Sequence, residues 1–161
     1  MLSITLPDGS KKDLPKGSTG LDLAKTIGPG LAKSAVAISI DGVQKDLDDT
    51  IEQDSLVSII TIDSDEGIEI MRHTLAAQVL AASIKTLYPE SKLAIGPTID
   101  NGFYYDVFSE KAISSDDLLA IEKEMRRVIQ NKSVINKTLH SRKEVSKFFK
   151  EKNEGYKLKI I

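Results

Sequence analysis

The sequence AVAISIDGV, residues 35–43, decides the fold of the first part of this chain. Residues 35–40 are rich in β-branched side chains, which fit the pleated surface of a sheet and predict a strand. Asp41-Gly42 is a strong signal for a two-residue hairpin turn, and Val43 begins the returning strand. The stretch therefore predicts a β-hairpin.

A second hairpin precedes this stretch, and a further strand follows it. Residues 3–6 alternate between polar and apolar side chains, residues 7–10 (PDGS) predict a turn, and residues 11–14 return. Residues 56–62 (LVSIITI) are mostly apolar and β-branched, and they supply the last strand. Two hairpins and a final strand are the parts of a small sheet.

A short helix is expected between the two hairpins. Thr19 and Asp22 match a capping box in which Asp replaces Glu, and the helix is expected to run through Ile27. Gly28-Pro29-Gly30 then stops it. A phosphate-binding loop usually opens a helix, so this triplet favours a C-cap over a phosphate site. The order hairpin, helix, hairpin, strand predicts a β-grasp, ubiquitin-like domain with one helix packed across a face of the sheet.

Residues 63–67 (DSDEG) are polar and acidic, and they predict a hinge between a domain at 1–62 and a domain at 63–161. A helix is expected from Ile68 to Leu87, because its apolar residues recur at steps of mostly three or four and Tyr88-Pro89 ends the pattern. Small residues on this helix would let another backbone element approach closely. The apolar stripe is Ile68, Met71, Leu75, Val79, Ala82 and Leu87, and the small residues are Ala76, Ala77, Ala81, Ala82 and Ser83.

The sequence IGPTIDNGFYYD, residues 95–106, combines two turn signals, three aromatic residues and two carboxylates. Gly96-Pro97 is expected to fix one turn and Asn101-Gly102 another. The aromatic residues would then be presented from a defined corner. This composition is typical of a binding or catalytic site.

Two further capping boxes predict two more helices in the second domain. They run from Ser114 to Asp117 and from Ser141 to Glu144. Gly155 is expected to end the last helix, and residues 156–161 to form a strand. Basic residues are frequent from Lys123 onward. Without stacking aromatic residues beside them, they favour a solvated face over an RNA-binding stripe.

Composition excludes several classes of function. The 22 Lys and Arg against 24 Asp and Glu give a net charge of -2, so no global positive field would attract nucleic acid. There is no Cys, which excludes disulfides, thiolate nucleophiles and cysteine-containing zinc motifs. With His73 and His140 as the two histidines, we expect no bound metal. No segment approaches the ~20 apolar residues that span a bilayer, so we expect a cytoplasmic protein with no membrane partner.

Several segments resemble one family. Residues 72–76 (RHTLA), 92–97 (KLAIGP) and 99–106 (IDNGFYYD) are similar to the start of the editing domain of threonyl-tRNA synthetase, and the similarity continues to Tyr156-Lys157. The first sixty residues also resemble the TGS module that precedes several synthetases. The resemblance rests on LPDGS at residues 6–10 and IGPGLAK at residues 27–33. Together the two resemblances cover the whole chain.

The resemblance implies the N-terminal portion of a threonine–tRNA ligase, with an α+β fold overall: a TGS-like β-grasp domain at 1–62, followed by the first, truncated part of an α+β editing domain at 63–161. The parent would be a class II synthetase that charges tRNA(Thr) with threonine, using ATP, Mg and Zn in a catalytic core outside these residues. We expect no cofactor within this segment. The parent would form a homodimer through its core, and its editing domain would clear mischarged Ser-tRNA(Thr).

In that family the editing pocket combines a His-x-x-x-His pair with a later Cys-x-x-x-His pair. His73 matches the first histidine, but Ala77 stands where the second would be, and the cysteine pair is absent. Gln78 lies next door, yet one step along an α-helix rotates a side chain by about 100°. The editing site is therefore incomplete, and we expect neither aminoacylation nor effective deacylation by this segment alone.

The resemblance assigns four residues to the editing pocket. His73 and Lys157 would be catalytic, with Lys157 donating to the reacting ester or water. Tyr104 and Gly96 would bind substrate, with Tyr104 shaping the ribose end. Ordinary roles stay open for three of them: an exposed helix residue for His73, a core aromatic for Tyr104, and a solvated lysine for Lys157.

Two other functions stay open. The chain would be a stand-alone, non-catalytic module that binds RNA or a protein partner if no synthetase core accompanies it. Alternatively, the parent would be a duplicate synthetase that no longer edits, if Ala77 is its natural residue.

Overall fold

The computed structural model describes residues 1–161 and divides into two compact units, Met1–Met71 and Arg72–Ile161. The division falls inside helix α3 (Asp65–Thr74), whereas the sequence predicts a hinge at residues 63–67. That hinge is wrong in its second half, because the Ser64 hydroxyl accepts a hydrogen bond from the Gly67 N–H (3.0 Å) and starts the helix early. The domain limits 1–62 and 63–161 stay a prediction.

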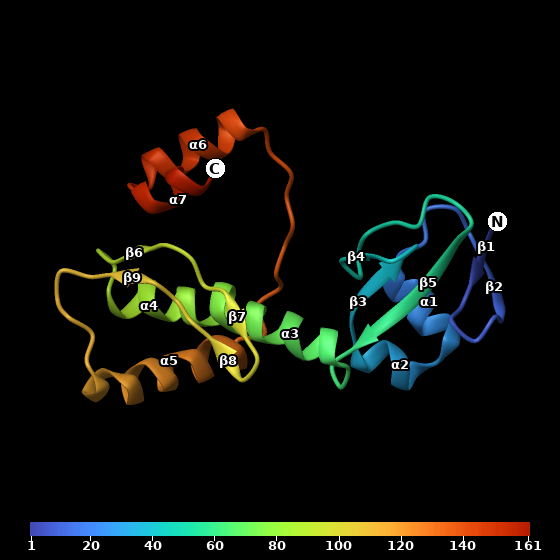
Figure 1. Ribbon diagram of the computed structural model, residues 1–161, viewed down its shortest axis with the longest axis horizontal. Helices are drawn as coiled ribbons and strands as arrows, with labels where there is room; N and C mark the ends of the chain where they lie inside the picture. The colour runs from blue at the N-terminus through green and yellow to red at the C-terminus, as the bar shows by residue number, and fades with distance from the viewer. The chain divides into compact units, whose positions relative to one another are not determined.

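The first unit is built on a five-stranded mixed sheet in the order β2-β1-β5-β3-β4 (Figure 1). β1 pairs antiparallel with β2, and it pairs parallel with β5 at the centre of the sheet. This topology confirms the predicted β-grasp and the α+β fold class. The strands are β1 (Leu2–Thr5), β2 (Lys11–Leu14), β3 (Ala35–Ile40), β4 (Val43–Lys45) and β5 (Ser55–Thr61).

The turn between β3 and β4 is the one that the sequence predicts. Asp41 has φ 50° and Gly42 has φ 83°, so both central residues are left-handed, as a type I′ hairpin requires. The same aspartate joins the hairpin to β5. Its N–H donates to the Leu56 carbonyl (2.8 Å), and its carboxylate accepts from the Leu56 N–H (2.9 Å).

Two helices, not one, connect the hairpins. The capping box at Thr19 and Asp22 is confirmed, and α1 (Gly20–Ile27) ends at Gly28. The glycine–proline triplet then opens a second helix, α2 (Pro29–Ser34), which the sequence analysis missed. Proline suits the first helical position because its φ is already helical and its missing N–H would have no partner there.

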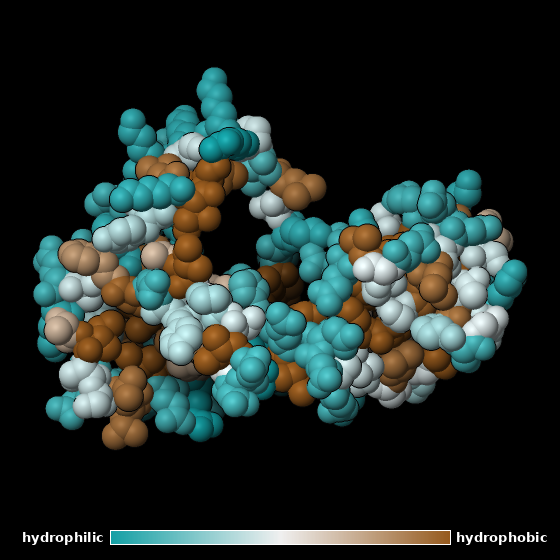
Figure 2. Space-filling model, in the orientation of Figure 1, coloured by the Kyte–Doolittle hydropathy of each residue, from teal (hydrophilic) through white to brown (hydrophobic).

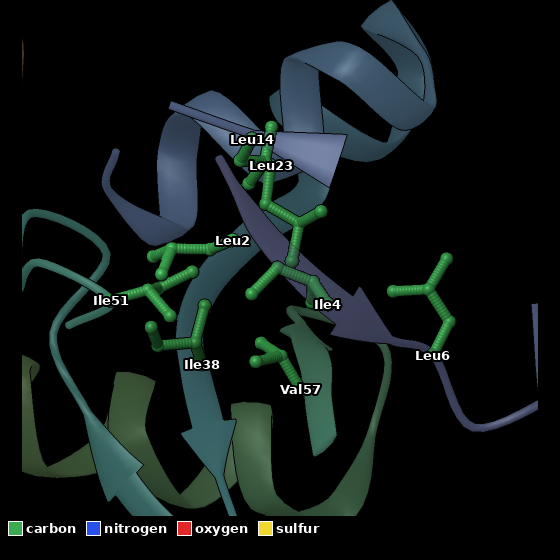
Figure 3. Packing of buried hydrophobic residues seen from close by; sticks show 8 residues of the cluster. All are labelled: Leu2, Ile4, Leu6, Leu14, Leu23, Ile38, Ile51 and Val57. Carbon is green, nitrogen blue, oxygen red and sulfur yellow. The ribbon is translucent and has the colours of Figure 1, made fainter. Parts of the chain in front are cut away.

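An apolar core lies between α1 and the sheet (Figure 3). Leu23 comes from the helix, Ile4, Ile38 and Val57 from three strands, and none of these four is exposed to solvent. A Cβ added at Gly20 would lie 2.4 Å from Cγ2 of Ile38, so glycine is what lets the helix begin directly against the sheet. The core residues are Leu2, Ile4, Leu6, Leu14, Leu23, Ile38, Ile51 and Val57.

The second unit begins with a long helical segment that changes its winding. α3 continues into the π-helix η1 (Leu75–Leu80) and then into α4 (Ala81–Leu87). The predicted helix is confirmed, but its predicted apolar stripe is wrong, since Ile68, Met71 and Leu87 are 37–40% exposed. The π-helical turn is wider than an α-turn and changes which residues share a face. The buried residues are Ala76, Ala81, Ser83 and Ile84. The predicted small-residue surface is therefore confirmed in part, since Ala77 is half-buried and Ala82 is exposed.

α5 (Leu118–Gln130) packs along this segment, next to α4 (Figure 1). It follows a single 3₁₀ turn, η2 (Ser115–Asp117), and the predicted capping box between Ser114 and Asp117 is confirmed. The buried centre of this unit is small. It consists of Ala81, Ile84, Leu93 and Ile121.

Residues 92–108 form one long hairpin instead of a cornered loop. Its ladders are β6 (Lys92–Leu93) with β9 (Val107–Phe108) and β7 (Thr98–Ile99) with β8 (Gly102–Phe103). Between the ladders, the Tyr104 N–H donates to the Pro97 carbonyl (3.0 Å), so the predicted turn at Gly96-Pro97 is wrong. Those two residues continue the arm, because cross-strand bonds satisfy the backbone on both sides of them. The turn itself, at residues 100–101, lies one residue earlier than predicted.

The last two elements are helices. The capping box at Ser141 and Glu144 is confirmed and opens α6 (Arg142–Glu151). The predicted C-terminal strand is wrong: α7 (Gly155–Ile160) stands there, and Gly155 opens this helix instead of ending the previous one. Asn153, with φ 56°, reverses the chain between the two helices. Helical bonds such as Leu158 N–H to the Glu154 carbonyl (3.2 Å) satisfy the backbone locally, where a strand would need a partner. None of the helices is long and apolar enough to cross a membrane.

Replacing Gly20 by Ala should destabilise the first unit by about 1–3 kcal/mol, because the new methyl group overpacks the core at Ile38. Gly30→Ala is the matched control, since nothing lies within 4 Å of a Cβ at that position. Chemical unfolding of the two variants and the wild type measures the difference. Equal stabilities of G20A and G30A would contradict the close approach of α1 to the sheet.

Candidate functional site

Lys157, in the first part of α7, reaches across to the hairpin of residues 92–108. Its ammonium donates to the Ala94 carbonyl (2.8 Å) and to the hydroxyl of Tyr105 (3.4 Å), and it lies 5.7 Å from the centre of the Tyr105 ring. The side chain is half-buried. Lys157 is therefore not a freely solvated lysine. It is a positioned cation at the edge of a hydrogen-bonded aromatic residue.

Gly96 lies beneath the same aromatic ring. A Cβ added at this glycine would be 2.4 Å from Cδ2 and 2.7 Å from Cε2 of Tyr105. Any side chain here would have to displace the ring. Gly96 is thus required by the packing of Tyr105, and through Tyr105 it is linked to Lys157.

Tyr104, which the sequence analysis assigned to substrate binding, points away from this contact. It is 62% exposed, so it is not a core aromatic. Along residues 103–108 exposure alternates strictly, with Phe103, Tyr105 and Val107 half-buried and their neighbours exposed. This alternation is the signal that would have identified Tyr105, because Asp106 marks the solvent face and places Tyr104 on it.

His73 lies in the last turn of α3 and is exposed. It is followed directly by the π-helix η1, where the Ala81 N–H donates to the Ala76 carbonyl five residues earlier. π-helical turns are rare and frequently occur at functional sites. Within η1, Ala77 is half-buried and Gln78 is exposed.

The structure thus brings together two of the four residues assigned to the site. Lys157 and Gly96 meet through Tyr105, whereas no hydrogen bond or ring contact joins the side chains of His73 or Tyr104 to them. Lys157 can supply a positive charge and hydrogen bonds to an ester or phosphate oxygen placed above the hairpin. An imidazole beside it would be needed to accept a proton from water.

A second candidate surface is the basic segment at residues 131–161. It carries nine Lys and Arg against three Glu, so the positive charge that the whole chain lacks is concentrated here. Aromatic rings do accompany the lysines, contrary to the expectation from sequence. Lys152 lies 5.9 Å from the Phe148 ring centre and Lys159 lies 5.6 Å from that of Tyr156. In Figure 2, hydrophobic residues (brown) lie at the molecular surface beside hydrophilic ones (teal).

A hollow of about 420 Å³ opens on this basic segment beside α6. Glu144 belongs to its wall, and its pKa is lowered because the Ser141 hydroxyl and backbone N–H donate to the carboxylate. This carboxylate is committed to capping α6. The lining residues are Thr138, His140, Glu144, Val145, Phe148 and Phe149.

Known proteins resemble both units. The TGS domain family matches residues 2–61. Over 160 residues, 99% of this chain, the sequence is 44% identical to a threonine–tRNA ligase of Bartonella tribocorum. It is 43% identical over 161 residues to that of Stenotrophomonas maltophilia and 44% identical over 161 residues to that of Psychrobacter cryohalolentis.

The chain corresponds to the N-terminal region of threonine–tRNA ligases. It spans about a quarter of the length of these relatives: 24% of the Bartonella ligase and 25% of each of the other two. The TGS match at residues 2–61 lies within the first unit. The predicted resemblance is thus confirmed over the whole chain.

The side chains present do not fit a metal site. No group of three or more His, Cys, Asp or Glu side chains lies close enough together to hold a metal ion.

Replacing Gly96 by Ala should destabilise the second unit by about 1–3 kcal/mol, because the methyl group forces the Tyr105 ring away from the hairpin. Gly102→Ala, in the same hairpin, is the matched control, since nothing lies within 4 Å of a Cβ there. Thermal unfolding measures stability, and the NMR signals of the Tyr105 ring report its displacement. An unshifted ring in G96A would contradict the packing described above.

Proposed function

We propose that this chain is the N-terminal part of a ligase that charges tRNA(Thr) with threonine. The observation that carries the proposal is the 44% identity to a threonine–tRNA ligase over 99% of the chain, together with the TGS match at residues 2–61. Such a ligase would use ATP, Mg and Zn in a catalytic core outside these residues. It would act in the cytoplasm as a homodimer held together by that core.

Within this ligase, the second unit would form part of the site that hydrolyses mischarged Ser-tRNA(Thr). The positioned ammonium of Lys157 supports this role, because a half-buried cation can stabilise the charge that develops on an ester oxygen. His73 would act as the proton acceptor, and Tyr104 would provide an exposed ring for the terminal nucleoside. Gly96 would act indirectly, by seating Tyr105 under Lys157.

Editing by this parent would be limited at position 77. A hydrolytic site needs a positioned proton acceptor for water. Here His73 supplies one imidazole, and the second imidazole of the family's pair is missing. Ala77 carries no polar group, and the neighbouring Gln78 is a neutral amide that cannot act as a general base near neutral pH.

The replacement Ala77→His in the full-length ligase should raise hydrolysis of Ser-tRNA(Thr) by roughly 10²-fold, the contribution typical of a positioned general base. Threonine charging, which belongs to the catalytic core, should stay unchanged. Gln78→His is the matched control, since it adds the same imidazole one residue further on. Deacylation of preformed Ser-tRNA(Thr) is the measurement, and an unchanged rate in A77H would contradict the idea that this position limits editing.

A second candidate function is RNA binding without chemistry. The concentration of positive charge in residues 131–161, with two lysines over aromatic rings, favours it over a purely solvated face. The two functions are compatible in one ligase, because an editing domain must hold the acceptor end of its tRNA.

Replacing Lys147, Lys150 and Lys152 together by Gln should weaken tRNA binding by the isolated chain and reduce its salt dependence, because up to three phosphate contacts are lost. The same change at Lys11, Lys12 and Lys16 of the first unit is the matched control. Filter binding at several salt concentrations measures both quantities. Equal losses in the two triple variants would contradict a specific role for the basic segment.

A further inference from the structure

A partly buried ion pair joins α4 to the residue that precedes α7, with the Lys85 side chain 34% exposed. The ammonium of Lys85 lies 2.8 Å from Oε1 of Glu154, whose side chain is 11% exposed. The same ammonium donates to the carbonyls of Pro89 (3.1 Å) and Ser91 (2.8 Å). A lysine ammonium has three donors, so each of them has a protein partner here. Lys85 thus ties together the end of α4, the loop that follows it, and the first turn of α7.

This ion pair carries much of the docking of the C-terminal helices. Glu154 is the one buried residue between positions 122 and 161, and neither α6 nor α7 contains a buried residue of its own. The apolar contacts of α7 involve side chains that stay at least partly exposed, such as the ring of Tyr156, whose centre lies 6.4 Å from that of Phe108. The polar contacts at Glu154 and Lys157 add directional attachment to these.

The cluster is not arranged for stability alone. Oε2 of Glu154 and Oγ of Ser91 are buried without a hydrogen-bond partner, which costs free energy. A buried ion pair with unsatisfied neighbours is often no more stable than an apolar packing of the same volume, and one use of such pairs is to specify a unique geometry.

The geometry that this ion pair specifies is that of Lys157. Glu154 precedes the first turn of α7, and its carbonyl accepts the N–H of Leu158 (3.2 Å), so the turn is closed around position 157. Fixing the carboxylate of Glu154 against α4 therefore fixes the direction in which Lys157 leaves the helix. That direction ends at the Ala94 carbonyl and the Tyr105 ring.

We propose that Glu154, held by Lys85, is a positioning residue that aims the Lys157 ammonium at the hairpin of residues 92–108. Its consequence for Ser-tRNA hydrolysis rests on the proposed function. The positioning itself is a property of this chain and is measured without tRNA.

The test is the reactivity of individual lysines in the 161-residue chain toward limiting acetylating reagent, followed by peptide mass spectrometry. In the wild type Lys157 should react slowly, since its ammonium is hydrogen-bonded and half-buried. In E154Q the acetylation rate of Lys157 should rise by roughly tenfold. This is the factor expected when the charge-assisted hydrogen bond between Glu154 and Lys85 no longer fixes the first turn of α7. K85M should give the same rise, and the double variant no more, because both changes break one ion pair.

Two variants serve as controls. E151Q breaks the exposed ion pair between Lys147 and Glu151 (3.9 Å) on the neighbouring helix, and it should leave Lys157 unchanged. S91A removes a buried hydroxyl that has no hydrogen-bond partner, and it should also leave Lys157 unchanged. The rate at Lys92, in β6, reports whether the unit has unfolded. If it has, K85Q, which removes the positive charge but keeps a polar side chain, replaces K85M as the milder variant.

A Lys157 rate in E154Q equal to that of the wild type would overturn the proposal, as would an equal rise in E151Q. In the full-length ligase, E154Q and K157A should lower Ser-tRNA hydrolysis without adding to each other. If the lysine rates change as expected but hydrolysis does not, the positioning stands and the proposed editing role fails.

Discussion

The ring of Tyr105 rests on the backbone at Gly96, where a methyl group would come within 2.4 Å of it. This close approach constrains the whole candidate site. It sets the height of the ring above the hairpin, and the Lys157 ammonium lies against that ring and against the Ala94 carbonyl beside it. The absence of a side chain at Gly96 thus determines where the ammonium of Lys157, which comes from α7, can lie. The sequence predicts a turn at Gly96-Pro97, but what requires glycine at position 96 is the packing of the Tyr105 ring.

The two units are stabilised in different ways. The first encloses a continuous core of eight apolar residues between one helix and a mixed sheet (Figure 3). The second has a core cluster of four buried apolar residues, two of them in α4, and it leaves large side chains such as Leu119, Val134 and Leu139 at least 79% exposed. Its C-terminal helices are attached by ammonium groups that reach carbonyl and carboxylate oxygens. Geometry in this unit is therefore specified by polar contacts more than by apolar burial.

Sequence analysis succeeded where the cause of a structure is local. Three capping boxes, at Thr19, Ser114 and Ser141, formed as predicted because their partners lie three residues away. The Asp41-Gly42 turn formed for the same reason, since its backbone angles depend on those two residues. The β-grasp order followed from these local elements.

The predictions that were wrong depend on contacts between residues far apart in the chain, or on a change in the winding of a helix. α7 replaces a predicted strand because its residues contact α4 and the hairpin, more than fifty positions earlier. Tyr105 was missed beside Tyr104, although the alternation around Asp106 indicated which ring faces solvent. The assignments of His73, Lys157, Tyr104 and Gly96 stay predictions. Of these, the contact of Lys157 could not be derived from spacing, because it depends on where α7 lies relative to a hairpin more than fifty positions earlier. The contact of Gly96 depends on which residues face each other across that hairpin.

The wide turn of η1 has a consequence for how such sequences are compared. A motif written with a fixed gap of three residues assumes a helix of constant pitch. Where the helix widens for one turn, residues that align in two sequences can point in different directions. For this helix, equivalence between residues of two family members is a matter of superposed atoms and not of matched columns.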